Sequence, residues 1–431
     1  MTAPTMPHQA GHRDSVKAQR LKRRHRAEAR FRLYGIVAVM LALTALVVLL
    51  GTIVRDGSSA LVTSEMRLEV FMDPAVIDPE KSGKPDDWRQ ANYSVIVLKA
   101  LQKIVPEATG RVDLLRLLKL ASSGARDVLR ERVLSDSSVI GKTIIVAVPT
   151  SDDVGLYRKG KISQGDGGLL NARQIAWIEK MEAAGVIYTT FNMRFFASGA
   201  SREPELAGIW SAIVGSALTL SVTLLLAFPL GVAAAIYLQE FAPKNKWTDV
   251  LEVNINNLAA VPSIVFGLLG LAVFLGVFGL PRSAPLVGGM VLALMTLPTI
   301  IIASRTAMQS VPPSIREAAI GLGASPLQVA AHHVLPLAMP GILTGSIIGM
   351  SRALGETAPL LMIGMVAFIV DAPTSPMDPA TVLPVQVFLW ADSPERAFAE
   401  KTAAAVMVLL VFLILMNGLA IFLRKKFERR W

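Results

Sequence analysis

Six long apolar stretches alternate with polar segments along the chain. Each is at least as long as the roughly 20 residues that a helix needs to cross the hydrocarbon core of a membrane. The pattern therefore predicts an all-α polytopic membrane protein with six transmembrane helices, at residues 35–54, 208–238, 258–280, 285–304, 338–370 and 402–423.

Residues 55–207 separate the first two apolar stretches and form a polar region long enough for its own core. Periodicity predicts both helices and strands there, so we expect an inserted domain of the α/β or α+β class. The predicted helices are residues 88–105, 111–120 and 171–184, and the predicted strands are residues 142–149 and 186–191.

Composition and charge agree with a membrane protein and indicate its orientation. Of the 431 residues, 52% are hydrophobic and only 18% are charged, with a net charge of +10. Residues 1–34 hold nine basic and two acidic residues, and residues 423–431 hold five and one. Basic segments beside apolar spans stay on the cytoplasmic side, so both tails are predicted there and nucleic-acid binding is disfavoured.

This orientation assigns the remaining segments. Lys244, Lys246, Arg305 and Arg316 then fall in cytoplasmic loops, whereas residues 55–207 and the mostly acidic residues 371–401 lie outside. The expected organisation is a basic tail (1–34), a membrane anchor (35–54), an extracytoplasmic domain (55–207), a five-helix core (208–423) and a second basic tail (424–431).

The first apolar stretch has an alternative reading as a cleaved signal peptide, since Ser58 and Ala60 offer small residues for cleavage. Its 20-residue length and the 34 residues before it favour an uncleaved anchor. The chain has no cysteine, which excludes disulfides, thiolate catalysis and cysteine-ligated metals.

One short segment resembles a phosphate-binding loop of nucleotide-binding proteins. In Gly141-Lys142-Thr143, however, Asp136 stands where that loop needs a glycine, and a strand follows in place of a helix. A nucleotide site is not expected in this chain.

A helical knob is predicted between the fourth and fifth apolar stretches, at residues 311–336. Ser314 and Glu317 have the spacing of a capping box, Gly321 and Gly323 end a first short helix, and Ser325 begins a second. The second helix is expected to end near Val334, before Leu335 and Pro336. Such a knob suits a partner's groove, although a plain connector would also fit the pattern.

Residues 338–370 carry two charges, Arg352 and Glu356, four residues apart and so on one face of a helix. Either charge facing lipid would cost several kcal/mol, so this face must look onto protein or a water-filled path. Gly355 and Pro359 are expected to weaken the helix there. The pair is either a static packing contact or an oxyanion site in which Arg352 is the donor and Glu356 orients it.

The knob resembles the EAA loop of the inner-membrane permease subunits of binding-protein-dependent ABC transporters. The resemblance rests on Glu317-Ala318-Ala319, on Gly323, and on Leu335-Pro336, with His333 replacing the family's usual aliphatic residue. It implies that the loop, with Ser314, seats in a separate ATPase subunit. His332 and His333 are neighbours on a helix, so they cannot chelate a metal together, and a surface role is expected.

Two further stretches resemble the phosphate-specific branch, and specifically the smaller of its two permease subunits. They are "SRALGETAPLL" at residues 351–361 and "NLAAVPSIVFGLLG" at residues 257–270. The resemblance, which covers residues 208–422, implies that Arg352 and Glu356 belong to the substrate path. We add Thr357 and Ser263 to the predicted path, although packing alone also explains Ser263.

The resemblance also implies partners and location. These are an ATP-binding cassette ATPase dimer, a second phosphate permease subunit, a periplasmic phosphate-binding protein and the bacterial inner membrane. The chain itself is then expected to have no catalytic residues, no metal and no cofactor, because ATP binds to the partner. Some members carry an extension like residues 55–207.

Two alternatives stay open. Arginine does not distinguish phosphate from sulfate, so another oxyanion or a small solute fits the same residues. A membrane receptor or sensor is the rival of another class. It would need a cytoplasmic output domain, whereas the longest predicted internal loop has about thirty residues.

Overall fold

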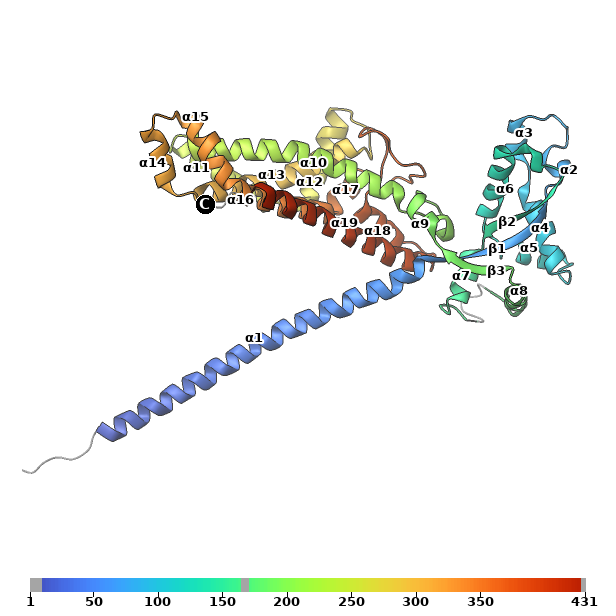
Figure 1. Ribbon diagram of the computed structural model, residues 1–431, viewed down its shortest axis with the longest axis horizontal. Helices are drawn as coiled ribbons and strands as arrows, with labels where there is room; N and C mark the ends of the chain where they lie inside the picture. Colours follow the sequence, from blue (N-terminus) through green and yellow to red (C-terminus); the bar gives the residue numbers. More distant parts are fainter. Residues whose placement is uncertain (1–9, 164–169, 428–431) are drawn as a thin grey trace, which may run out of the picture. The chain divides into compact units, whose positions relative to one another are not determined.

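The computed structural model describes residues 10–163 and 170–427 (Figure 1). The outer ends of the two predicted basic tails lie outside these residues. The chain divides into two units, Met1–Arg55 and Asp56–Trp431. The first unit contains most of helix α1 (Ala10–Ala60), and the apolar residues of its predicted membrane anchor are exposed along their whole length. Such exposure suits a helix surrounded by lipid.

The second unit begins with a three-stranded antiparallel sheet of order β2-β1-β3. The strands are β1 (Val62–Phe71), β2 (Thr143–Pro149) and β3 (Ile187–Phe191). Both outer strands were predicted, but the central strand β1 was missed. Met66, Leu68 and Val70 alternate along β1 and are fully buried, so the sheet has one face in the core. An antiparallel sheet with helices makes this region α+β.

Helices pack on this sheet to complete what we call the N-terminal region, residues 56–207. Predicted helix 88–105 is in fact two helices, which break at Ala91 and Asn92. The other two predicted helices are confirmed within two residues. The helices are α2 (Pro74–Ile77), α3 (Pro85–Gln90), α4 (Tyr93–Ile104), α5 (Arg111–Leu118), α6 (Gly124–Ser135), α7 (Asp152–Arg158), α8 (Ala172–Ala183) and α9 (Met193–Ala197), with 3-10 turns at Ser137–Val139 and Pro204–Leu206.

The rest of the second unit is helical, and we call it the core, residues 208–427. Helices α10, α13, α16 and α19 pack in succession along one another (Figure 1). The elements are α10 (Trp210–Ile236) with a π-helical end (Tyr237–Phe241), α11 (Lys246–Ala259), α12 (Ser263–Leu269) with a π-helical end (Gly270–Val277), α13 (Pro285–Gln309), α14 (Pro313–Gly321), α15 (Pro326–Gln328), a π-helical segment (Val329–Val334), α16 (Leu335–Gly355), α17 (Ala358–Met362), α18 (Leu383–Ala391) and α19 (Phe398–Phe427).

Among the described residues, five helices are long and apolar enough to cross a membrane. The predicted span at residues 258–280 is not one of them. It belongs to a pair of helices, Lys246–Ala259 and Ser263–Val277, bent by 102° at Pro262, and this pair would be the sixth span. Pro262 lies at the break and lacks the backbone donor that a continuing helix would use there. Arg305 is also not in a loop but inside α13.

The predicted span at residues 338–370 is likewise shorter than expected. Helix α16 ends at Gly355, and Glu356 has an extended backbone (φ −77°, ψ 121°). Only the short α17 follows before the chain continues as a loop. The break at Gly355 and Pro359 that the sequence predicts is therefore complete, and it places Glu356 just beyond the end of a membrane helix.

Small residues allow the core helices to approach closely. A Cβ atom on Gly345 of α16 would come within 2.1 Å of the Ala303 Cβ atom on α13. A Cβ atom on Gly231 of α10 would come within 2.7 Å of the Ile300 side chain on α13. Glycine at such contacts is typical of membrane helix bundles, in which tight packing replaces the hydrophobic effect between helices.

Candidate functional site

Arg352 and Glu356 form an ion pair at the C-terminal end of α16, with 3.6 Å between Nε and Oε1. Their side chains differ in exposure, because 57% of Arg352 is accessible but only 20% of Glu356. The guanidinium has five donors, and the pair to Glu356 engages one of its nitrogens. Within the described residues, the rest of the group is open to another ligand or subunit.

Thr357 and Ser263, the other predicted path residues, lie on neighbouring helices. Thr357 directly precedes α17 and accepts backbone hydrogen bonds from Leu360 and Leu361 through its carbonyl oxygen. Ser263 begins α12, which packs against α17. The Ser263 hydroxyl has no hydrogen bond within the described residues, so it is free to meet a ligand or water.

The two sequence stretches that suggested the substrate path meet at one contact. A Cβ atom on Gly267 of α12 would come within 2.7 Å of the Pro359 Cα atom at the start of α17. Both atoms belong to segments that flank predicted path residues, Ser263 on one side and Thr357 on the other. The structure therefore brings residues 257–270 and 351–361 together, as a common site requires.

Arg352 is also positioned by a residue that sequence reasoning missed. Ser351 donates a hydrogen bond from its hydroxyl to Asn417 Oδ1 on α19, at 2.6 Å. Because Ser351 immediately precedes Arg352, this bond between α16 and α19 constrains the rotation of the helix that carries the arginine. The signal in the sequence was a lone amide within an otherwise apolar membrane helix.

The loop at residues 311–336, which we call the EAA loop, contains the two short helices expected from the sequence. Gly323 has φ +84°, a left-handed conformation that ends α14 and that glycine adopts without strain. Ser325 caps α15 in a capping box with Gln328. Glu317 and Ala318 are exposed, whereas Ala319 is buried against the core. His332 and His333 are both exposed.

Two local predictions for this loop are wrong. Ser314 is not a cap, because α14 begins one residue earlier, at Pro313, and its N-cap residue Pro312 has no side-chain donor or acceptor. The second helix also does not stop before Leu335 and Pro336. It continues through a π-helical segment into α16, and Pro336 lies where the π-helical and α-helical parts join.

Arg316 holds the EAA loop to the core, a role not foreseen from the sequence. Its guanidinium contacts Glu240, with 3.0 Å between Nη2 and Oε1, and donates to the carbonyl oxygens of Met308 and Val311. The free face of the loop carries three exposed apolar side chains, Ile320, Leu322 and Leu327. An anchored base with an apolar free face is suited to binding another protein.

Two protein families match the chain. Residues 227–431 match the family described as binding-protein-dependent transport system inner membrane component. Residues 18–166 match a domain of unknown function, DUF3333. Together the two matches cover most of the core and much of the N-terminal region.

Individual relatives resemble parts of this chain. The probable ABC transporter permease protein YqgI of Bacillus subtilis is 33% identical over 171 residues, which are 39% of this chain and 58% of that protein. The phosphate transport system permease protein PstA of Yersinia pestis is 33% identical over 221 residues, 51% of this chain and 74% of that protein. A solved structure of the MetNI methionine ABC transporter in an inward-facing conformation aligns over 51% of this chain and 98% of its own, at 17% identity and a TM-score of 0.42.

Proposed function

Because the chain belongs to the family of phosphate transport system permease proteins, we propose that it forms the phosphate path of an ATP-driven importer. It is a multi-pass protein of the bacterial inner membrane. Its relatives are transport permeases, and we assign the chain no catalytic role of its own.

The Arg352–Glu356 pair carries this proposal. An arginine is always charged and presents a planar fork of donors that matches the oxygens of a phosphate. The exposed guanidinium is available to an incoming oxyanion, while Glu356 holds one side of it. In the empty state the carboxylate balances the positive charge, which would otherwise be costly within a membrane.

Thr357 and Ser263 are the proposed neutral contacts of the path. A hydroxyl can donate to a phosphate oxygen without adding charge, and the contact between α12 and α17 holds the two segments beside each other. Phosphate would then pass from the arginine to these hydroxyls without leaving polar surroundings.

We propose that the energy comes from an ATP-binding cassette ATPase dimer that binds the EAA loop. The exposed Ile320, Leu322 and Leu327 supply an apolar contact, and Glu317 supplies a charge at its edge. ATP would bind to the partner, so this chain needs no cofactor. A change in how the ATPase contacts the loop would shift the equilibrium between inward-open and outward-open states.

The remaining proposed partners complete the path. A second phosphate permease subunit would cover the exposed side of Arg352, and a periplasmic phosphate-binding protein would deliver the substrate. This arrangement places both chain ends and the EAA loop in the cytoplasm and the N-terminal region outside. The proposed orientation rests on the basic tails, because basic segments are retained on the cytoplasmic side.

Uptake of labelled phosphate at limiting external concentration tests the proposal, with labelled sulfate measured in parallel. Cells with and without this gene are compared, and re-expression of the full chain serves as the control. Loss of phosphate uptake alone is the expected result. Loss of sulfate uptake alone would show that the substrate is another oxyanion and not phosphate. Unchanged uptake of both ions would overturn the proposal.

A further inference from the structure

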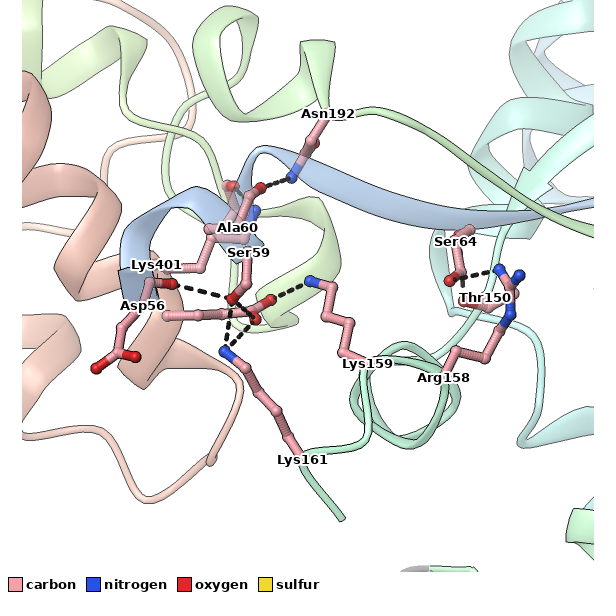
Figure 2. Close-up of polar contacts among 12 residues, drawn as sticks. Asp56, Ser59, Ala60, Ser64, Thr150, Arg158, Lys159, Lys161, Asn192 and Lys401 are labelled. Carbon is pink, nitrogen blue, oxygen red and sulfur yellow. Dashed lines mark hydrogen bonds and ion pairs between the residues drawn. The ribbon is translucent and has the colours of Figure 1, made fainter. Parts of the chain in front are cut away.

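A cluster of charged groups around one buried glutamate joins the N-terminal region to the core (Figure 2). Glu400, in the first turn of α19, has a side chain only 8% exposed. It pairs with Lys159 at 2.5 Å and Lys161 at 2.9 Å, and it accepts a hydrogen bond from the Ser59 hydroxyl at 2.7 Å. We call these four residues the Glu400 cluster.

The cluster connects three separate parts of the second unit. Ser59 lies in the last turn of α1, Lys159 and Lys161 follow α7 of the N-terminal region, and Glu400 belongs to the core. Both carboxylate oxygens of Glu400 are engaged, one by Lys159 and the other by Lys161 and Ser59. One core carboxylate is therefore the common partner of the groups that approach it from the other two segments.

The next residue strengthens the same junction. Lys401 is 3% exposed, donates a hydrogen bond to the Ala207 carbonyl oxygen at 3.1 Å, and lies 5.1 Å from the centre of the Phe195 ring. Phe195 of α9 also packs near Trp390 of α18, which stacks on Phe398 of α19. Polar and apolar contacts thus fix α19 to the N-terminal region at one place.

The buried charges make this junction selective for one arrangement. Removing Glu400 and most of Lys159 from water is costly, and this cost is offset only while the two groups pair. Burial lowers the pKa of Lys159, and the neighbouring Glu400 opposes that shift. Sliding α19 relative to α7 would separate Glu400 from Lys159 and leave a buried carboxylate unpaired, so the cluster resists such a movement.

The opposite part of α19 contacts the proposed substrate path. Asn417 accepts the hydrogen bond from Ser351, the neighbour of Arg352. With a rise of 1.5 Å per residue, Glu400 and Asn417 are about 25 Å apart along one continuous helix. A single rigid element thus touches the N-terminal region at one end and the arginine-bearing helix at the other.

We propose that the N-terminal region is a working part of the transporter, coupled through Glu400 and α19 to the Ser351–Arg352 segment. Glu400 and Asn417 are positioning residues in this scheme, since neither touches the substrate. The N-terminal region then fixes α19, and α19 fixes the rotation of α16 during transport. The transport consequence rests on the proposed function, but the mechanical coupling does not.

The absence of cysteine makes a direct test practical. Cysteines replace Lys103 on α4 and Arg282 before α13, two exposed positions in the N-terminal region and the core. Nitroxide labels on the full chain in lipid nanodiscs then report the distribution of distances between the two parts. We expect a single narrow distribution in the parent protein and a clearly wider one in Glu400→Gln.

Three further variants separate coupling from folding. Glu395→Gln, at an exposed glutamate just before α19 whose carboxylate accepts a hydrogen bond from nearby Ser393, should change nothing. Reversing the charges, with Glu400→Lys, Lys159→Glu and Lys161→Glu together, should restore the narrow distribution. Asn417→Leu should leave the distribution narrow, because the Glu400 cluster is intact.

The second readout is phosphate taken up per ATP hydrolysed by the assembled complex. Glu400→Gln and Asn417→Leu should each lower this ratio by about tenfold, since small displacements of binding groups cost one to two orders of magnitude. An unchanged distance distribution in Glu400→Gln, or an unchanged ratio in both variants, would overturn the proposal. If the parent protein transports no phosphate, the proposed function is wrong. The distance measurements still test the mechanical coupling in that case.

Discussion

Gly267 lies directly against Pro359, so closely that a Cβ atom would sit 2.7 Å from the proline Cα atom. Backbone atoms line the contact on the Pro359 side, and they cannot rotate away as a side chain does. This relationship ties the helix that begins at Ser263 to the helix that follows Glu356 and Thr357. The contact leaves no room for a larger side chain at position 267.

Gly267→Val should therefore separate α12 from α17. Overpacking of this kind costs about 1–3 kcal/mol, and it would displace Ser263 relative to Thr357. We expect a lower melting temperature and strongly reduced phosphate uptake. Gly276→Ala is the matched control, because a Cβ atom there meets its nearest neighbour at an ordinary 3.5 Å. Normal uptake in Gly267→Val would show that this contact does not shape the path.

Arg352→Gln should reduce phosphate uptake by about a hundredfold, since a charge-assisted bidentate contact contributes up to about 3 kcal/mol. Membrane insertion should be unaffected, because the change removes a charge from a membrane helix. Arg352→Lys keeps the charge but loses the planar fork, so intermediate uptake is expected. Uptake rates normalised to the amount of protein in the membrane give the comparison, and full activity in the glutamine variant would reduce the pair to a packing contact.

Gly323→Val should uncouple ATP hydrolysis from transport. The glycine has φ +84° and open space around it, so the substitution acts through the backbone alone, at a cost of about 1–3 kcal/mol. The EAA loop would change its exposed face while the core stays folded. Gly321→Ala, at an open helical position, is the control. Measuring ATPase activity and uptake on the same reconstituted complex decides the matter, and a fully coupled valine variant would contradict the expectation.

Ser325→Ala should destabilise the start of α15, whereas Ser314→Ala should not affect α14. Loss of an N-cap costs about 1 kcal/mol. Ser325 accepts a hydrogen bond from the Gln328 backbone, but Ser314 makes no such bond in the described residues. Amide hydrogen exchange over the EAA loop should speed up about fivefold near residue 328 in the first variant only. Equal effects of the two substitutions would reject the assigned cap.

Glu205 should make the stability of the protein fall as pH rises. Burial raises the pKa of Glu205 from 4.5 to about 7, nearby Asp152 adds to the shift, and a hydrogen bond from Ser122 opposes it. Between pH 4.5 and about 7 the folded state binds more protons than the unfolded state, so the free energy of unfolding decreases through this window. The full loss is about 3 kcal/mol.

Thermal unfolding of the purified full chain at several pH values measures this effect. Glu205→Gln should flatten the decrease, because the amide does not titrate. Glu131→Gln is a suitable control, since Glu131 is an exposed glutamate of the same region. A parent protein whose stability does not fall between pH 4.5 and 7 would contradict the assignment.

The sequence predicts the long helices well because the membrane imposes a simple rule of length and apolarity. Helix α10 begins within two residues of its predicted span, and α13 begins at the predicted Pro285. The rule fails at residues 258–280 and 338–370, where apolar composition continues through a break. Hydropathy reports how apolar a segment is. It does not detect a proline that interrupts the pattern of helical hydrogen bonds.

Strand β1 was missed although its signal is present. Met66, Leu68 and Val70 alternate with Arg67 and Glu69, which is the period of a half-buried strand. The strand follows directly on the long helix α1, so its pattern is easily absorbed into that helix. Its partners come from residues about 80 and 120 positions later, a distance that local periodicity does not cover.

In the candidate site, too, contacts between residues close in sequence are predictable and contacts between distant residues are not. Arg352 and Glu356 are only four residues apart, so they stay within reach of each other even though α16 ends at Gly355 between them. The Glu400 cluster joins Glu400 to Lys159 and Ser59, which are 241 and 341 residues away in the chain. Nothing local in the sequence around Glu400 predicts these partners, because they meet only after the whole second unit has folded.

The helix that emerges from the EAA loop has a mechanical consequence. From Pro326 to Gly355 the chain forms one uninterrupted helical column of 30 residues, about 45 Å long. Its first turn belongs to the surface where the ATPase is proposed to bind, and its last turn carries Arg352. Because the column is continuous, a movement of the loop by the ATPase would be transmitted along it to the arginine.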